Sequence, residues 1–393
     1  MTTTEHRQST VDALRGFALL GILVVNIATF ASAHYGAGLP DPLATSFAER
    51  GAVFVRTFFF ETKFYLLFSF LFGYSFTLQL QAAERAGASF APRMARRLAM
   101  LWLLGVLHAV LLYQGDILTT YAVIGLVLLM LRRRSDAFLL RGAVALLFAT
   151  ALLWGGFSLL LSLWLGGASL DMRGAYAQAD AALAAYRATP ADVVAQHLRD
   201  LAQIWWITVL IQAPCALAMF FAGCVAGRRR LLADGGVPAA VWRRVWIWGL
   251  AVGLPGAAFY AASVHRLDDT ARSFQGLAVT LFTAPFLSAA YGAGLVLLLR
   301  TPCGRALEAW LAPAGRMALS NYLLQSLVCA WLFLAYGLRR IGETGPLAAM
   351  AIACAIFACQ LLLSRWWMRR FAYGPFEWLL RAVTNLQLPP MRR

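Results

Sequence analysis

Charged side chains are scarce in this chain. They make up 13% of its 393 residues, whereas hydrophobic residues make up 61%. Soluble domains carry roughly 25% charged residues, so the composition excludes a water-soluble protein and also excludes intrinsic disorder. A bilayer core of roughly 30 Å is crossed by a helix of about 20 apolar residues, and the chain contains many such runs. We therefore predict an all-α, polytopic integral membrane protein.

Lysine is almost absent as well. Lys63 is the only lysine, so the net charge of +16 rests on arginine. In a soluble protein this charge would suggest nucleic-acid binding. Here the arginines lie mostly at the ends of apolar runs, which fits the positive-inside rule and contact with anionic lipids. We expect membrane lipids and no nucleic acid as partners. The six cysteines lie in or beside apolar runs, so no disulfide is predicted.

Apolar windows predict about ten membrane spans. They are 11–31, 58–79, 98–114, 117–131, 138–165, 201–227, 241–264, 274–299, 317–336 and 346–363. The first span holds Asp12 and Arg15 and lacks a clear cleavage site, so we expect a retained helix and not a signal peptide. An even number of spans places both termini on one side. That side carries most of the arginines, and we predict that it is cytoplasmic.

The whole chain, 1–393, is expected to form a single transmembrane domain. Its longest outer segment, 166–200, includes an alanine-rich stretch with helical propensity and is predicted to form an extracytoplasmic cap. The cytoplasmic tail, 367–393, has the aromatic and apolar pattern of a helix that lies in the inner interface. Kinks are predicted at three prolines inside spans: Pro214, Pro255 and Pro285.

Polar side chains near the inner ends of two spans form the first candidate site. Each ionisable group inside a span costs about 2.5–3.5 kcal/mol on insertion scales, so it is a functional candidate, with linkage between helices as the alternative. Asp12, Arg15 and Asn26 share one helical face. We predict an Asp12–Arg15 ion pair, which either fixes the helix or leaves Arg15 to receive a phosphate group. A second stripe on the ninth span comprises Arg316, Ser320, Asn321 and Gln325.

Glu61 and Lys63 lie near the outer end of the second span. Because they are two residues apart they do not face each other, so each needs a partner on another helix or in a wet cavity. Lysine can lose its proton when it is desolvated, and arginine cannot. A role in a substrate pocket and a structural role are both open for this pair.

Histidines suggest a base in the same outer region. His108 lies roughly 10 Å below the turn that follows it, and is either a hydrogen-bonded core residue or a general base. Asp116 either orients its imidazole or caps the next helix. His34 would face the mouth of this pocket or be an ordinary loop residue. A looser cluster of His265, Asp268 and Asp269 lacks metal-ligand spacing, and we predict no metal.

Five motifs occur in order along nearly the whole chain. They are Asp12-Ala-Leu-Arg15-Gly16 with Asn26, Lys63-Phe64 with Phe70-Leu71-Phe72-Gly73, His108 with Gly115-Asp116-Ile117-Leu118, Gly315-Arg316-Met317 with Asn321 and Gln325, and Gly374-Pro375-Phe376-Glu377-Trp378. Together they resemble the YeiB-type family of bacterial inner-membrane proteins. The resemblance implies a multi-pass protein of the bacterial inner (plasma) membrane.

The first helix and the loop after it are also similar to those of the heparan-alpha-glucosaminide N-acetyltransferase group. Those transmembrane acyltransferases move an acyl group from cytoplasmic acyl-CoA to an acceptor across the membrane. Their catalytic histidine lies in the loop after the first helix, where this chain has His34. Its spacing from Asp12 differs, so we rank His108 above His34 as the base.

The sequence therefore predicts acyl transfer from acyl-CoA to a glycan or lipid acceptor in an outer pocket. The donor would approach near Arg15 and Arg316, and His108, aided by Asp116, would deprotonate the acceptor. Hydrogen bonds to the oxyanion of the transition state would come from Lys63, Asn321 or Gln325. Glu61 would add a polar group from the outer side. The alternatives are a transporter or lipid-binding protein with an intramembrane polar path, and a scaffold with structural charges.

Overall fold

The computed structural model describes residues 3–85, 87–166, 171–233, 236–264 and 270–392. Helices make up its regular structure, and no strand is assigned within these ranges. In chain order they are α1 (Thr3–Ala31), α2 (Ala33–Gly36), α3 (Phe47–Val55), the π-helix η1 (Arg56–Phe60), α4 (Lys63–Arg85), α5 (Phe90–Leu111), α6 (Leu118–Leu131), α7 (Asp136–Leu165), α8 (Arg173–Ala188), α9 (Pro190–Ile207), the π-helix η2 (Thr208–Gln212), α10 (Ala213–Arg228), α11 (Ala239–Val264), α12 (Thr270–Leu299), α13 (Pro302–Arg316), α14 (Ala318–Phe333), α15 (Pro346–Arg370) and α16 (Pro375–Asn385).

The apolar helices agree with the predicted spans. In the described part of the chain, 8 helical runs are long and apolar enough to cross a membrane, and α6 and α14 are shorter apolar helices. The all-α polytopic membrane fold is thus confirmed. Two of the long runs, Phe47–Arg85 and Pro190–Arg228, each contain a π-helix. The second π-helix directly precedes the segment with Pro214, whose ring disfavours a regular α-helical hydrogen bond there.

The helix ends differ from the predicted ones where arginine is frequent. The predicted span 98–114 begins instead at Phe90, and the predicted span 346–363 continues to Arg370. Both extensions carry arginines, whose long side chains can reach the interface while the backbone stays helical.

The amphipathic helix α13 was not predicted. It packs against α1, where a Cβ added at Gly16 would lie 2.3 Å from the Leu311 carbonyl oxygen, so this close contact requires glycine.

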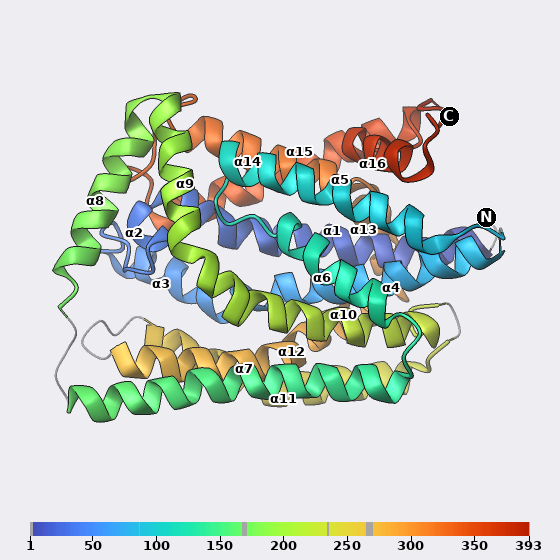
Figure 1. Ribbon diagram of the computed structural model, residues 1–393, viewed down its shortest axis with the longest axis horizontal. Helices are drawn as coiled ribbons and strands as arrows, with labels where there is room; N and C mark the ends of the chain where they lie inside the picture. The colour runs from blue at the N-terminus through green and yellow to red at the C-terminus, as the bar shows by residue number, and fades with distance from the viewer. Residues whose placement is uncertain (1–2, 86, 167–170, 234–235, 265–269, 393) are drawn as a thin grey trace.

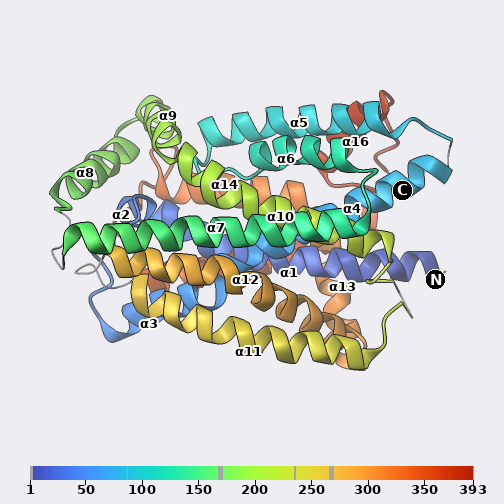
Figure 2. The ribbon, with the colours of Figure 1, turned by 60° about the horizontal axis from the view of Figure 1, so that its bottom comes forward.

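The two termini lie at the same end of the bundle, and α8 lies at the opposite end (Figure 1). We call these the inner and outer ends, following the arginine distribution. The views in Figures 1 and 2 place α5 on one side, α11 on the other, and α1 and α4 between them. The alanine-rich helix predicted in segment 166–200 is α8. It is held at the outer end, where Arg187 Nε donates to the carbonyl of Ile341 at 2.9 Å.

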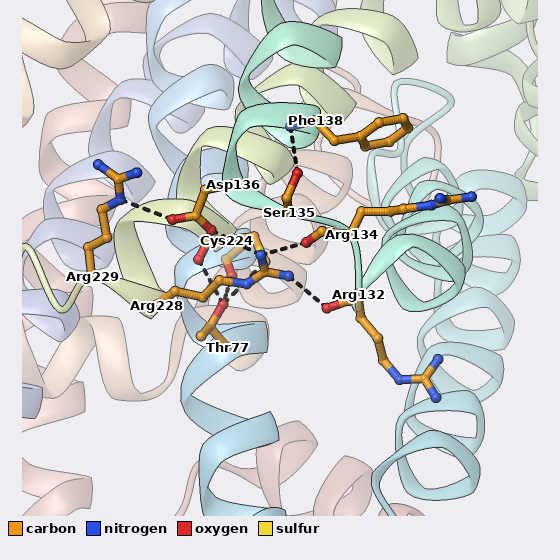
Figure 3. Close-up of polar contacts among 10 residues, drawn as sticks. Thr77, Arg132, Arg134, Ser135, Asp136, Phe138, Cys224, Arg228 and Arg229 are labelled. Carbon is orange, nitrogen blue, oxygen red and sulfur yellow. Dashed lines mark hydrogen bonds and ion pairs between the residues drawn. The ribbon is translucent and has the colours of Figure 1, made fainter.

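Two arginine clusters meet at the inner end (Figure 3). Arg228 donates to the carbonyl of Arg132 at 2.6 Å and to that of Arg134 at 2.8 Å. Asp136 forms ion pairs with Arg228 and Arg229, both at 3.0 Å. The last carbonyls of a helix lack partners within it, so Arg228 closes the end of α6. These arginines therefore join α6, α7 and α10 in addition to facing the inner interface.

Candidate functional site

A chain of three buried side chains lies where α5 turns into α6. His108 Nδ1 lies 2.8 Å from Asp116 Oδ1, and His108 Nε2 lies 2.8 Å from Ser326 Oγ on α14. The relative exposure of His108 and Ser326 is 2% each, and that of Asp116 is 6%. We call these residues the relay. Direct contact between Asp116 and His108, which a spacing of eight residues left open, is present.

Asp116 both orients the imidazole and caps α6. Its Oδ2 accepts hydrogen bonds from the backbone N–H of Thr119 at 2.8 Å and from the Thr119 hydroxyl at 2.9 Å. The two helices approach closely at this point, since a Cβ added at Gly105 would lie 2.9 Å from Asp116 Oδ2. The two interpretations of Asp116 are therefore compatible, because each carboxylate oxygen serves one of them.

The contacts fix the proton on one nitrogen when the imidazole is neutral and Asp116 is ionised. A carboxylate only accepts, so in that state Nδ1–H donates to Asp116 and Nε2 accepts the proton of the Ser326 hydroxyl. The ring is enclosed by Tyr322 at 4.9 Å and by Tyr113 at 6.1 Å between centroids. This arrangement is that of an activated hydroxyl, with a base and an orienting acid in line.

Ser326 was not predicted. A single hydroxyl in an apolar span gives little indication of function, and the predicted polar stripe lies on another face of the same helix. Ser326 follows Gln325 directly, which rotates it by about 100° around the helix. Only the contact between His108 of α5 and Ser326 of α14 identifies it.

Two members of the predicted stripe, Asn321 and Gln325, face α15, whereas Arg316 ends α13. Asn321 Nδ2 donates to Ser364 Oγ at 2.9 Å, and Gln325 Nε2 donates to Gln360 Oε1 at 2.8 Å. Gln360 in turn donates to the carbonyl of Asn321 at 2.9 Å. These contacts link the two helices. The structure does not place either amide in a hydrogen bond with the relay, and their contacts favour the structural interpretation.

Glu61 is the centre of a second buried cluster at the outer end. Its Oε1 accepts from Tyr35 Oη at 2.8 Å, Arg56 Nε at 3.1 Å and Thr57 Oγ1 at 3.2 Å. Its Oε2 accepts from Tyr260 Oη at 3.4 Å. Burial, together with the Glu61 charge, raises the pKa of Tyr35 above its ordinary value, so this hydroxyl stays a donor. We call these residues, with Lys63, the outer cluster.

Lys63 is fully buried in this cluster. Its Nζ donates to the carbonyl of Thr57 at 2.9 Å and lies 5.7 Å from the centre of the Tyr260 ring. The helix is interrupted just before it, and Thr62 takes a φ of 68°. Within the described chain no hydrogen bond joins the outer cluster to His108. The structure thus separates Lys63 and Glu61 from the relay.

His34 and Asn26 form no hydrogen bond with the relay in the described part of the chain. His34 Nε2 is 3.2 Å from Asp180 Oδ1 of α8, so this histidine attaches the loop after α1 to the cap. Asn26 is half-buried. His265, Asp268 and Asp269 lie outside the described residues. In the part that is described, no group of three or more histidine, cysteine or acidic residues could hold a metal ion.

An inner cavity of about 160 Å³ is lined by two of the predicted inner residues. Arg15 and Arg316 line it, and Arg15 pairs with Asp12 at 2.8 Å, as predicted. Arg97 is a third arginine in its wall and was not predicted. The remaining wall is largely apolar and includes Tyr322, whose ring rests on His108. The cavity therefore extends from an arginine-rich end towards the relay.

Two further hollows adjoin these residues. A groove of about 470 Å³ shares Arg97 and Gln79 with the cavity and adds Arg93 and Arg381. An apolar groove of about 480 Å³ is lined by His108 with leucines and tryptophans of α5, α14 and α15. Large side chains along it are exposed, such as Trp366 at 45%, so this groove opens to the lipid phase.

The C-terminal motif anchors the tail beneath the cavity. Glu377 Oε1 accepts from the backbone N–H groups of Leu319 at 2.7 Å and Ser320 at 3.1 Å, and its Oε2 accepts from Ser320 Oγ at 2.5 Å. The carboxylate thus caps the start of α14. Burial raises the pKa of Glu377, while these hydrogen bonds oppose the shift. Helix α16 is therefore held against α14 and α5.

Comparisons with known proteins place these motifs in one family. Residues 226–387 match the family described as "Protein of unknown function (DUF418)". The chain is 33% identical to the uncharacterized protein YxaH of Bacillus subtilis (strain 168), over 100% of this chain and 98% of that protein. It is 30% identical to the uncharacterized 39.9 kDa protein in the amylase 3′ region of Bacillus acidopullulyticus, over 98% and 96% of the two chains. It is also 30% identical to the uncharacterized protein YeiB of Escherichia coli (strain K12), over 96% of each chain.

No solved structure matches the chain. Each of these three matches covers nearly the whole length of both chains, and not an isolated segment. The chain belongs to the YeiB-type family of bacterial membrane proteins.

Proposed function

We propose that this protein is an acyltransferase of the bacterial inner membrane. It transfers an acyl group from cytoplasmic acyl-CoA to a glycan or lipid acceptor at the outer side. The observation that carries the proposal is the buried imidazole of His108, which lies between a carboxylate and a hydroxyl. An imidazole held in this way is a general base for acyl transfer at neutral pH.

The inner cavity supports a donor that carries phosphates. Acyl-CoA has a diphosphate and a further phosphate at one end and a thioester at the other. Arg15, Arg97 and Arg316 provide guanidinium groups suited to phosphate oxygens. A cavity of about 160 Å³ is too small for the whole donor, so its nucleotide end would lie in the adjoining groove with Arg93 and Arg381.

Arg97→Gln is expected to raise the KM for acyl-CoA about tenfold or more with a smaller effect on kcat. A hydrogen bond between charged groups is worth about 1.5–3 kcal/mol, and here it would be lost equally in the ground and transition states. Initial rates at varied acyl-CoA concentrations measure both constants. Arg133→Gln is the control, because this arginine is exposed and lies outside the cavity. An unchanged KM in Arg97→Gln would exclude this donor site.

The reaction is tested with purified protein in detergent. Radiolabelled acetyl-CoA or longer acyl-CoAs are incubated with an extract of membrane lipids and polysaccharides, and the products are separated. Label in an acceptor, formed without a membrane gradient and lost in His108→Ala, is expected. Absence of transfer by folded wild-type protein would contradict the proposal. Gradient-dependent flux in proteoliposomes, without a new covalent bond, would identify a transporter instead.

A further inference from the structure

Both ring nitrogens of His108 already have partners. Nδ1 lies 2.8 Å from Asp116 Oδ1 and Nε2 lies 2.8 Å from Ser326 Oγ, and a neutral imidazole beside an ionised carboxylate donates from Nδ1 and accepts at Nε2. An acceptor molecule can therefore give its proton to Nε2 only after it replaces the serine hydroxyl. The proton that His108 is placed to remove is the proton of Ser326. The sequence suggested that His108 deprotonates the acceptor directly. In the structure, however, Nε2 contacts the hydroxyl of Ser326.

We propose that Ser326 carries the acyl group covalently between donor and acceptor, an inference that rests on the proposed acyltransferase function. In the first step Ser326 Oγ attacks the thioester carbonyl carbon while His108 Nε2 takes the hydroxyl proton. The carbon–sulfur bond breaks, and the proton passes to the leaving thiolate, which gives an acyl ester on Ser326 and a free thiol. In the second step an acceptor hydroxyl or amine attacks this ester. His108 takes the acceptor's proton and returns it to Ser326 Oγ.

The position of Ser326 suits such a carrier. It lies one helical turn beyond Tyr322, which lines the inner cavity and packs on His108. On its other side, His108 lines the groove that opens to lipid. Access from the cavity requires the Tyr322 ring to rotate away from the imidazole. A covalent ester would let the acyl group pass this point while the charged donor stays at the inner end.

The ester is tested by trapping it in the absence of acceptor. Full-length protein is mixed with radiolabelled acetyl-CoA, quenched in acid and digested, and the labelled peptide is identified by mass spectrometry. We expect a stoichiometric acetyl ester on Ser326 that is lost in Ser326→Ala and in His108→Ala. Ser288→Ala is the matched control, because Ser288 is an equally buried serine on α12, and this variant should keep the ester.

A fluorophosphonate probe separates the covalent step from the overall reaction, because it labels an activated serine without any acyl donor. Labelling of Ser326 in the wild type, lost in His108→Ala, supports the proposal even where the true donor is not an acyl-CoA. Transfer that persists in Ser326→Ala but not in His108→Ala would overturn the covalent step and leave the acyltransferase in place. Neither ester nor probe adduct on folded wild-type protein would also overturn it. Ser326→Cys, with a thiol in the same position, should retain the covalent intermediate.

Discussion

Asp116→Asn is expected to lower the rate of acyl transfer by a factor on the order of 10⁴ while the fold is kept, the loss that follows when the carboxylate of a serine–histidine–aspartate triad becomes an amide. The structure determines how the new amide would lie. Two donors of Thr119 point at one oxygen of Asp116, so the amide oxygen must stay there. The amide NH₂ then faces His108 Nδ1. That nitrogen becomes an acceptor, the proton moves to Nε2, and His108 can no longer accept the proton of Ser326.

The measurement is kcat at saturating acyl-CoA, with a thermal unfolding curve for each variant. Thr119→Ala is the matched control, because it removes one hydrogen bond to Asp116 and leaves the carboxylate and the backbone donor. It should cost far less activity than Asp116→Asn. Activity of Asp116→Asn within tenfold of the wild type would show that the relay is structural.

The sequence predicted what depends on local periodicity. The apolar spans and the Asp12–Arg15 pair, three residues apart, are confirmed. Contact of Asp116 with His108 across one short turn was one of two alternatives, and the structure shows it. In each case the partners lie on one helix or in one hairpin. The number of residues between two such partners then limits how far apart their side chains can lie.

Contacts between distant helices could not be predicted in this way. Ser326 and His108 are 218 residues apart in the chain, and no periodicity relates them. Arg97 was assigned to the arginines of a helix end, because only the packing of α5 beside α1 and α14 turns it towards a cavity. Helix α13 is too polar for a hydropathy window and was missed for that reason.

The outer cluster illustrates the same limit. Glu61 and Lys63 were each predicted to need a partner on another helix or in a wet cavity. Glu61 has such partners in Tyr35 and Tyr260, whereas Lys63 donates to the carbonyl of Thr57, six residues before it. The charged partner of Glu61 was not predicted. It is Arg56, which lies outside the predicted span 58–79 and reaches Glu61 at 3.1 Å through the π-helix η1. Such single π-helical turns often occur where a side chain must be redirected for a particular contact.

Glu61→Ala is expected to destabilise the protein by about 3–5 kcal/mol, the usual cost of removing one partner from a buried ion pair. Arg56 has a relative exposure of 5% and would be left without its neighbouring countercharge. Tyr35 and Tyr260 would each lose an acceptor as well. The free energy of unfolding, or the midpoint of thermal unfolding in detergent, measures the loss.

Two further variants identify the cause. Glu61→Gln keeps an oxygen for Tyr35 and Thr57 but removes the charge, so it should be destabilised less than Glu61→Ala. The double variant Arg56→Met with Glu61→Leu removes both charges at once, and replacing a whole buried pair by apolar residues is often tolerated. It should therefore recover much of the stability that Glu61→Ala loses. A Glu61→Ala protein that unfolds like the wild type but lacks transfer activity would contradict this expectation. Such a result would place the outer cluster in the substrate pocket, because a carboxylate that only offsets Arg56 cannot be removed without a loss of stability.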